Sequence, residues 1–160
     1  MSVRKKFTEL IYDEMAREEK IYFITADLGW KHFDQLRLTY PDRFINVGAA
    51  EQLLIGASVG IALEGKIPVV YSMTPFLLYR PFEFIRVHID HDKIPVKLFG
   101  AGRDKDYDWL GFTHWSHDDR EHTKGFTNIE KHWPNDSEEM DDIFLDVIHS
   151  NYPTYVNLKR

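Results

Sequence analysis

Cysteine is absent from the 160 residues of this chain. Its absence excludes a disulfide framework, a thiolate metal site and a cysteine nucleophile, and it suits a reducing compartment. Long apolar runs are also missing: no stretch approaches the roughly 20 residues of a membrane helix. The amino-terminal MSVRKKFTEL lacks the apolar segment of a signal peptide. These absences predict a cytoplasmic protein without a membrane partner.

Basic residues are fewer than acidic ones. The chain has 20 Lys and Arg against 26 Asp and Glu, which gives a formal net charge of −6. Binding to a nucleic-acid backbone normally requires a basic surface, so no nucleic-acid partner is expected. The hydrophobic content of 43% is enough to build a core. The length fits one domain of ordinary size, and we expect that domain to span residues 1–160.

Helix-type and strand-type patterns alternate along the chain. Helical spacing of apolar residues predicts helices over 4–18, 31–38, 51–64, 76–91 and 138–150. Short apolar runs predict strands over 21–26, 44–47, 67–72, 96–100 and 154–158. The stretch 101–137 carries few signals. Such alternation is typical of an α/β protein, a three-layer fold with a mainly parallel β-sheet between helices.

The predicted helix 51–64 is unusual. It is apolar on nearly every face and contains small residues such as Gly56 and Gly60, so we expect it to be buried and closely packed. It also begins at a place where ligands are expected, because ligands of parallel α/β sheets bind at the carboxyl ends of the strands. The segments at that edge would be 27–31, 48–51, 72–76 and 100–114.

Residues 43–52 (RFINVGAAEQ) resemble the RFxxxGIAEQ stretch of the transketolase and deoxyxylulose-phosphate synthase families. The likeness continues through 74–77 (TPFL), through 80–86, which is similar to the RAYEQIR of these families, and through 111–114 (GFTH), which is similar to their GPTH. The resemblance covers essentially the whole chain. It implies a domain that binds the aminopyrimidine half of thiamine diphosphate.

In these families two domains meet across a dimer interface and share the cofactor, and the second domain holds the diphosphate and Mg²⁺ through a Gly-Asp-Gly motif. Neither Asp-Gly nor Gly-Asp occurs here. The resemblance therefore implies a separate diphosphate-binding subunit that holds Mg²⁺, in a homodimer or an α₂β₂ hetero-oligomer. It further implies a transferase that moves a two-carbon ketol unit of a small phosphorylated sugar or related carbonyl substrate.

Glu51 matches the catalytic carboxylate of these families. The resemblance implies that it hydrogen-bonds a pyrimidine nitrogen and favours the imino form that takes the proton from the thiazolium carbon. An apolar site favours the protonated carboxyl group that this role needs, whereas a helix N-terminus favours the anion by up to about 1–2 kcal/mol. From the residues alone, Glu51 could equally be an ordinary first-turn glutamate.

Four further residues match family positions at the cofactor. Aromatic residues at the places of Phe76, Tyr79 and Phe82 stack on and enclose the pyrimidine ring, although their helical spacing also fits a core stripe. Asp27 follows a predicted strand directly, and its family counterpart contacts the cofactor. The alternative for Asp27 is a residue that caps a turn.

Three residues match family positions at the substrate. His114 corresponds to a histidine that contacts the substrate, where an imidazole can donate to an oxyanion or move a proton, so it is a second catalytic candidate. Arg4 and Arg160 correspond to places that bind the substrate phosphate, which suits the geometry of a guanidinium group. Without the resemblance, all three would be ordinary surface residues.

The sequence departs from these families at sugar-binding positions. Leu110 stands where they have an aspartate that contacts a sugar hydroxyl, Lys31 stands at a serine-like phosphate contact, and 103–109 replaces a glycine-rich stretch that carries a substrate histidine. A lost hydrogen-bond partner weakens selection for the corresponding hydroxyl. We therefore expect either a changed substrate or a loop that the partner subunit reshapes.

Other functions stay open at this stage. The chain could be a non-catalytic binding or scaffolding module of the same fold, or a subunit of a thiamine-dependent 2-oxo acid decarboxylase or of an enzyme like deoxyxylulose-phosphate synthase. The number of histidines in one loop suggests a zinc site, but their spacing matches no compact ligand motif. No metal site is therefore predicted in this chain. The histidines concerned are His114, His117, His122 and His132.

Overall fold

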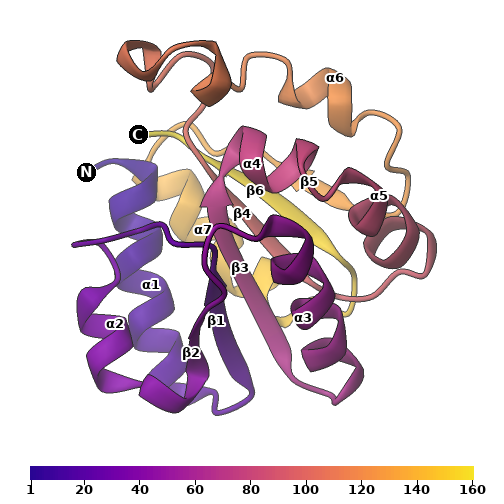
Figure 1. Cartoon of the computed structure of the whole chain (residues 1–160). Coiled ribbons are helices and arrows are strands. Elements are labelled where there is room, and N and C mark those ends of the chain that lie inside the picture. The colour runs from indigo at the N-terminus through magenta and orange to yellow at the C-terminus, as the bar shows by residue number, and fades with distance from the viewer.

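A computed structural model describes all 160 residues of the chain. A six-stranded sheet runs through its middle, with the strand order β2-β1-β3-β4-β6-β5, and every neighbouring pair is parallel. Figure 1 shows helices on both faces of this sheet. The predicted three-layer α/β fold is therefore confirmed. The strands are β1 (Ile21–Thr25), β2 (Phe44–Asn46), β3 (Ile67–Met73), β4 (Lys97–Ala101), β5 (Glu130–His132) and β6 (Thr154–Leu158).

Seven α-helices surround the sheet, and a π-helical segment over Ile85–His91 extends one of them. None of the helices combines the length and apolarity that crossing a membrane requires. The α-helices are α1 (Val3–Arg17), α2 (Asp34–Thr39), α3 (Glu51–Leu63), α4 (Thr74–Tyr79), α5 (Phe82–Phe84), α6 (Asp119–Thr123) and α7 (Ser137–His149). Short 3₁₀ turns cover Pro41–Arg43, Asp108–Leu110 and Phe112–His114.

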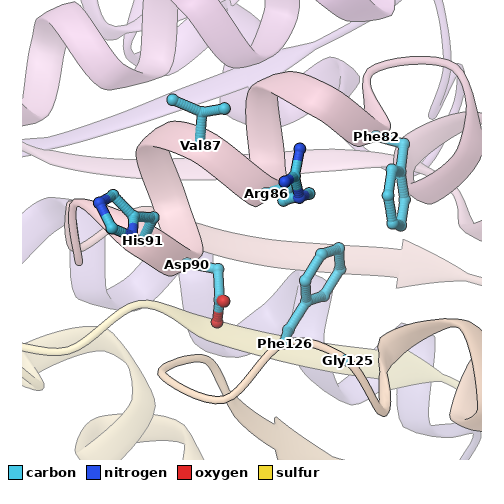
Figure 2. A pocket seen from close by; sticks show the side chains of 7 residues that line it. All are labelled: Phe82, Arg86, Val87, Asp90, His91, Gly125 and Phe126. Atoms are coloured by element: carbon cyan, nitrogen blue, oxygen red, sulfur yellow. The ribbon is translucent and has the colours of Figure 1, made fainter.

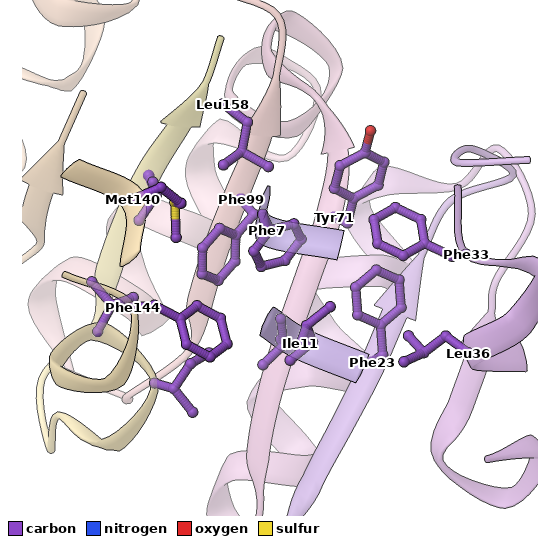
Figure 3. Packing of buried hydrophobic residues seen from close by; sticks show 14 of the residues in the cluster. Phe7, Ile11, Phe23, Phe33, Leu36, Tyr71, Phe99, Met140, Phe144 and Leu158 are labelled. Atoms are coloured by element: carbon purple, nitrogen blue, oxygen red, sulfur yellow. The ribbon is translucent and has the colours of Figure 1, made fainter. Parts of the chain in front are cut away.

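Aromatic side chains fill the core between the sheet and helices α1, α2 and α7 (Figure 3). Phe7 of α1 stacks on Phe99 of β4 with 4.2 Å between ring centroids, and Phe144 of α7 meets Phe7 edge-on. Offset and edge-on contacts are the favoured arrangements of such rings. This packing fixes the start of α1 beside the carboxyl end of the sheet, where Arg4 N–H donates to the carbonyl of Lys159 at 3.2 Å.

Helix α3 is less buried than its sequence predicts. Leu54, Ile55 and Ser58 are buried against the second face of the sheet, but Leu53 is 57% exposed and Leu63 is 71% exposed. The reason is that α3 packs on β1 and β3, and no other element of this chain covers its outer side completely. The expectation of a buried helix therefore holds only for the side of α3 that faces the sheet.

Two other expectations need correction. The single helix predicted over 76–91 is interrupted after Tyr79, because Pro81 has no N–H to continue the helical hydrogen bonds. Strand β5, with the sequence Glu-Lys-His, was missed within 101–137. It lies at the edge of the sheet, where charged residues are common because they discourage pairing with other chains.

Candidate functional site

The site forms where the carboxyl ends of the strands meet the beginnings of the following helices. The loops after β1 and β2 are tied together by the side chain of Asn46: its Oδ1 accepts the N–H of Asp27 at 2.9 Å and that of Gly48 at 3.0 Å. Gly48 adopts a left-handed conformation with φ of 73°, which glycine tolerates without strain. This turn leads directly into α3, so that Glu51 stands at its first position.

Glu51 is buried, with 5% of its surface exposed, and it is ion-paired. Nη1 of Arg80 donates to Oε1 of Glu51 at 2.8 Å. The same guanidinium group lies over the ring of Phe76, with 3.7 Å between Cζ and the ring centroid. The expected apolar surroundings are therefore not what the carboxylate meets in this chain, because the guanidinium group of Arg80 contacts it.

Phe76 connects this pair to His114. The two rings meet edge-on with 5.0 Å between their centroids, and Nδ1 of His114 lies 3.0 Å from the hydroxyl of Thr113. The structure thus brings two residues from α3 and α4, Glu51 and Phe76, and the loop residue His114 into one neighbourhood, with Arg80 between the first two. From the sequence, Arg80 was identified only as part of the stretch 80–86 that resembles RAYEQIR and not as a site residue, and 29 positions separate it from Glu51.

Tyr79 lies in the pocket next to Phe76. This pocket has a volume of about 250 Å³, and its lining includes Phe76, Tyr79, Arg80, Phe112 and Trp115. The Tyr79 hydroxyl donates to Oδ1 of Asp118 at 2.6 Å. Burial, and then this hydrogen bond, raise the pKa of Tyr79 far above its usual value, so its phenol stays protonated as a donor.

Phe82 lies apart from this group. It faces a different pocket of about 560 Å³ (Figure 2), where its ring is 5.3 Å from that of Phe126. Arg86, Asp90 and His91 complete much of the lining. The predicted aromatic trio is therefore divided between two pockets, because the helix breaks at Pro81 between Tyr79 and Phe82.

Asp27 is exposed at the end of β1. Its backbone has a φ of 53°, and Lys31 in the same loop has a φ of 69°. Asparagine and aspartate adopt this left-handed conformation more readily than most residues. Asp27 thus helps to form the turn, because its N–H donates to Asn46. Its carboxylate is exposed at the carboxyl edge of the sheet, where the sequence predicted the site.

Arg4 and Arg160 come together around Tyr107. Nη1 of Arg4 donates to the Tyr107 hydroxyl, while the guanidinium of Arg160 lies 4.4 Å from the ring centroid of Trp109 and 5.6 Å from that of Tyr107. Burial, with a smaller contribution from the charge of Arg4, lowers the pKa of His32 nearby. Two arginines from opposite ends of the sequence therefore meet at the aromatic side chains of Tyr107 and Trp109. The sequence had not identified these two aromatic residues as part of the site.

A buried network holds the loop that carries Asp118. Oδ2 of Asp119, a residue only 3% exposed, accepts from Trp133 Nε1 at 2.9 Å, from the Tyr155 hydroxyl at 2.8 Å and from Asn157 Nδ2 at 2.9 Å. Three donors on one carboxylate satisfy a charge that would otherwise be costly to bury. The network fixes α6 to the sheet, which positions Asp118 next to Tyr79.

The histidine-rich loop does not form a cluster of ligands. His122 Nε2 lies 3.3 Å from Oδ2 of Asp118, and the ring of His117 packs edge-on against Phe112 and Trp115. No group of three or more His, Asp or Glu side chains is arranged to hold a metal ion. These histidines contact carboxylate and aromatic neighbours instead.

Comparisons with known proteins agree on one family. The family description "Transketolase, pyrimidine binding domain" matches residues 1–160. The chain is 39% identical over 119 residues to one subunit of the apulose-4-phosphate transketolase of Actinobacillus succinogenes, covering 74% of this chain and 38% of that protein. It is 27% identical to the 6-deoxy-6-sulfo-D-fructose transketolase subunit SqwH of a Clostridium species, covering 99% of this chain and 49% of that protein.

A solved structure shares the whole fold. It is described as "Split gene transketolase, inactive beta4 tetramer", and it superposes with a TM-score of 0.87 at 25% identity over 100% of this chain and 51% of that chain. The chain therefore spans about half or less of the length of the proteins that it matches. The activities of those longer proteins therefore also depend on residues that this chain does not contain.

Proposed function

Because the chain belongs to the transketolase family as a pyrimidine-binding domain, we propose that it binds the aminopyrimidine half of thiamine diphosphate in a transferase that moves two-carbon ketol units. One observation carries this proposal: the buried carboxylate of Glu51 and the ring of Phe76 lie close enough for a single flat group, now that of Arg80, to contact both. A carboxylate acceptor beside an aromatic face is the environment that an aminopyrimidine ring needs.

Glu51 has the central role in this proposal. When bound, thiamine diphosphate supplies a nucleophilic carbon that adds to carbonyl groups. Glu51 would hydrogen-bond the pyrimidine nitrogen that faces it, and the burial of its side chain, with 5% exposed, would limit the access of water to that bond. Phe76 would support the ring from one side. Tyr79, Asp27 and, from the separate pocket that it faces, Phe82 are the further cofactor contacts that we propose.

The substrate would lie between His114 and the two arginines. His114, which lies against Phe76, is our candidate for the hydrogen bond to a substrate oxygen. Arg4 and Arg160 around Tyr107 form a cationic end for a phosphate group. Two relatives are named for sugars with a phosphate or a sulfonate group, and both groups are tetrahedral anions. The altered positions Leu110 and Lys31 support a sugar other than the usual pentose phosphates.

A second chain completes the proposed enzyme. The Gly-Asp-Gly signature for diphosphate and Mg²⁺ is missing from this sequence, and the relatives quoted above are named as subunits. The split-gene relative is described as inactive when it consists of β chains alone. These facts support a separate subunit that holds the diphosphate and Mg²⁺, in a homodimer or an α₂β₂ hetero-oligomer.

The test is to co-express the chain with the product of the neighbouring reading frame and measure ketol transfer with and without thiamine diphosphate. Glu51→Gln should lower turnover by roughly 100-fold or more, because it removes the group that exchanges the proton. Glu64→Gln, at the exposed end of the same helix, is the matched control and should retain activity. Full turnover of Glu51→Gln would refute the role of Glu51.

The same assay separates the other functions. Release of CO₂ from a 2-oxo acid without ketol transfer would identify a decarboxylase. Binding of the partner with no thiamine-dependent turnover of either kind, and no calorimetric binding of the cofactor, would identify a scaffolding module.

A further inference from the structure

The side chain of Arg80 occupies a defined place in the site. Its guanidinium group makes two contacts at once, a hydrogen bond of 2.8 Å to Oε1 of Glu51 and a stacking contact of 3.7 Å with the ring of Phe76. We propose that Arg80 fills the place of the aminopyrimidine ring in the free chain and is displaced when the cofactor binds. This inference rests on the proposed function and concerns the regulation of the same site.

The chemistry of the two groups is alike. A guanidinium group is flat, delocalised and cationic, and it donates N–H groups in its plane. A 4-aminopyrimidine that takes a proton on the ring nitrogen opposite its amine is also a flat, delocalised cation with an N–H in its plane. Both can donate to a carboxylate while they lie on an aromatic face. Glu51 and Phe76 therefore form a site for flat N–C–N cations, and Arg80 is its internal ligand.

The position of Arg80 allows it to leave. Its side chain is 49% exposed, in contrast to the 5% of Glu51. It stands just after the end of α4 and before Pro81, where the helix is interrupted. The guanidinium can thus swing toward solvent through side-chain rotation alone, while the backbones of Glu51 and Phe76 stay within α3 and α4.

Displacement has a consequence for Glu51. As long as Arg80 is in place, Oε1 of Glu51 is engaged by a permanent cation and is not available to a ligand. The arriving aminopyrimidine substitutes one flat donor for another, so that the buried carboxylate is never left without a partner. The arrangement keeps the Glu51 carboxylate paired with a side chain of its own chain until the cofactor is present.

The test measures binding of 4-amino-5-hydroxymethyl-2-methylpyrimidine to the full-length chain by ligand-observed NMR. Arg80→Met keeps the length of the side chain but removes the guanidinium, and it should bind the pyrimidine about tenfold more tightly than the wild type. Arg17→Met is the matched control, because Arg17 is an exposed arginine in the last turn of α1, at the opposite end of that helix from Arg4; its affinity should equal that of the wild type. Equal or weaker binding by Arg80→Met overturns the inference.

Guanidinium ions provide a second measurement, which applies even if Arg80→Met is less stable. In that variant, millimolar guanidinium chloride should compete with the pyrimidine, whereas NaCl at the same ionic strength should not. An identical effect of the two salts overturns the inference. Each variant is first checked for folding by circular dichroism, since Arg80→Met leaves the Glu51 carboxylate without its cation.

The experiment distinguishes this inference from the proposed function. Adding Glu51→Gln to Arg80→Met should abolish pyrimidine binding. If wild type and Arg80→Met bind equally well and both depend on Glu51, the proposed function survives and only the role of Arg80 fails. If no variant binds the pyrimidine, both fail.

Discussion

The hydroxyl of Tyr79 donates to Oδ1 of Asp118 across 2.6 Å and links the end of α4 to the residue just before α6. The two residues are 39 positions apart in the sequence. The bond therefore connects the element that carries Phe76 with the loop that closes the pocket over it. Because that pocket is part of the candidate site, loss of this hydrogen bond should affect both the stability of the fold and the geometry of the site.

Tyr79→Phe tests this link. The change should lower the free energy of unfolding by about 1–2 kcal/mol at neutral pH, as expected for a hydrogen bond to a charged acceptor at a partly exposed site. Tyr152→Phe, which alters an exposed tyrosine, should have no measurable effect. Urea unfolding of both variants at pH 7 is the measurement, and equal stabilities would contradict the prediction.

The pH dependence of that difference follows from Asp118. Burial acts to raise the pKa of Asp118, but hydrogen bonds from Tyr79 and from the backbone outweigh it, so that the pKa is lowered from the usual 3.8. A carboxyl group with a lowered pKa stabilises the fold above its unfolded pKa and loses that contribution as the pH falls through the folded pKa. The difference between wild type and Tyr79→Phe should be constant above about pH 5 and shrink below about pH 4.

Lys97 should make the stability of the fold depend on pH at alkaline pH as well. Its buried ammonium donates to the carbonyls of Ser150 at 2.7 Å and Tyr152 at 2.6 Å, and burial lowers its pKa to about 8 from 10.5. Between these values the unfolded chain binds more protons than the folded one, so the contribution of Lys97 to stability increases with pH. Below about pH 8 both states are charged, and the full desolvation penalty applies.

The comparison with Lys97→Met isolates this effect. The stability of the wild type relative to Lys97→Met should rise between about pH 8 and pH 10, by an amount on the order of 1–3 kcal/mol. Lys66→Met, at an exposed lysine, is the control and should differ from the wild type by a constant amount over this range. A flat profile for Lys97→Met would show that the amine keeps its ordinary proton affinity.

Asp119→Ala should be the most destabilising of these changes. It leaves the half-buried donor Trp133 and the buried donors Tyr155 and Asn157 without their common acceptor, which costs on the order of 3–5 kcal/mol. Asp141→Ala breaks a partly exposed ion pair with Lys6 and should cost less than about 1 kcal/mol. Guanidinium denaturation of the two variants gives both numbers, and similar losses would refute the importance of the network.

Arg160→Met tests the cationic end of the site under the proposed function. In the assembled enzyme it should raise KM for a phosphorylated sugar by about tenfold with little change in kcat, because the contact is the same in ground state and transition state. For the unphosphorylated sugar, the wild type and Arg160→Met should have the same KM. Arg17→Met, at the far end of α1, is the control, and a KM that does not respond to Arg160→Met would place the phosphate elsewhere.

Much of the fold could be predicted because its signals are local. The apolar spacing of Phe7 and Ile11 identifies α1, and continuous runs such as Ile67–Met73 identify buried strands. Strand β5 could not be found this way, since its pairing with β6 rather than its composition makes it a strand. Pro81 itself indicates a break in the helix, but the apolar periodicity on both sides of it led to the prediction of one continuous helix.

The site was only partly predictable, for a related reason. Its individual members carry family signals, but their mutual contacts depend on tertiary structure. Glu51 meets Arg80, and Arg4 meets Tyr107, only after the strands align their carboxyl ends. The exposed outer side of α3, with Leu53 and Leu63, likewise follows from which elements this chain has available to cover it.

Asn46 has a consequence for motion at this edge. Its single Oδ1 accepts both the Asp27 and the Gly48 amides, so a movement of the Asn46 side chain removes the acceptor of both loops at once. Where opening begins at Asn46, the amide protons of Asp27 and Gly48 should therefore exchange with solvent at a common rate. Because the turn at Gly48 leads directly into α3, such an opening would reach the first turn of that helix, where Glu51 stands.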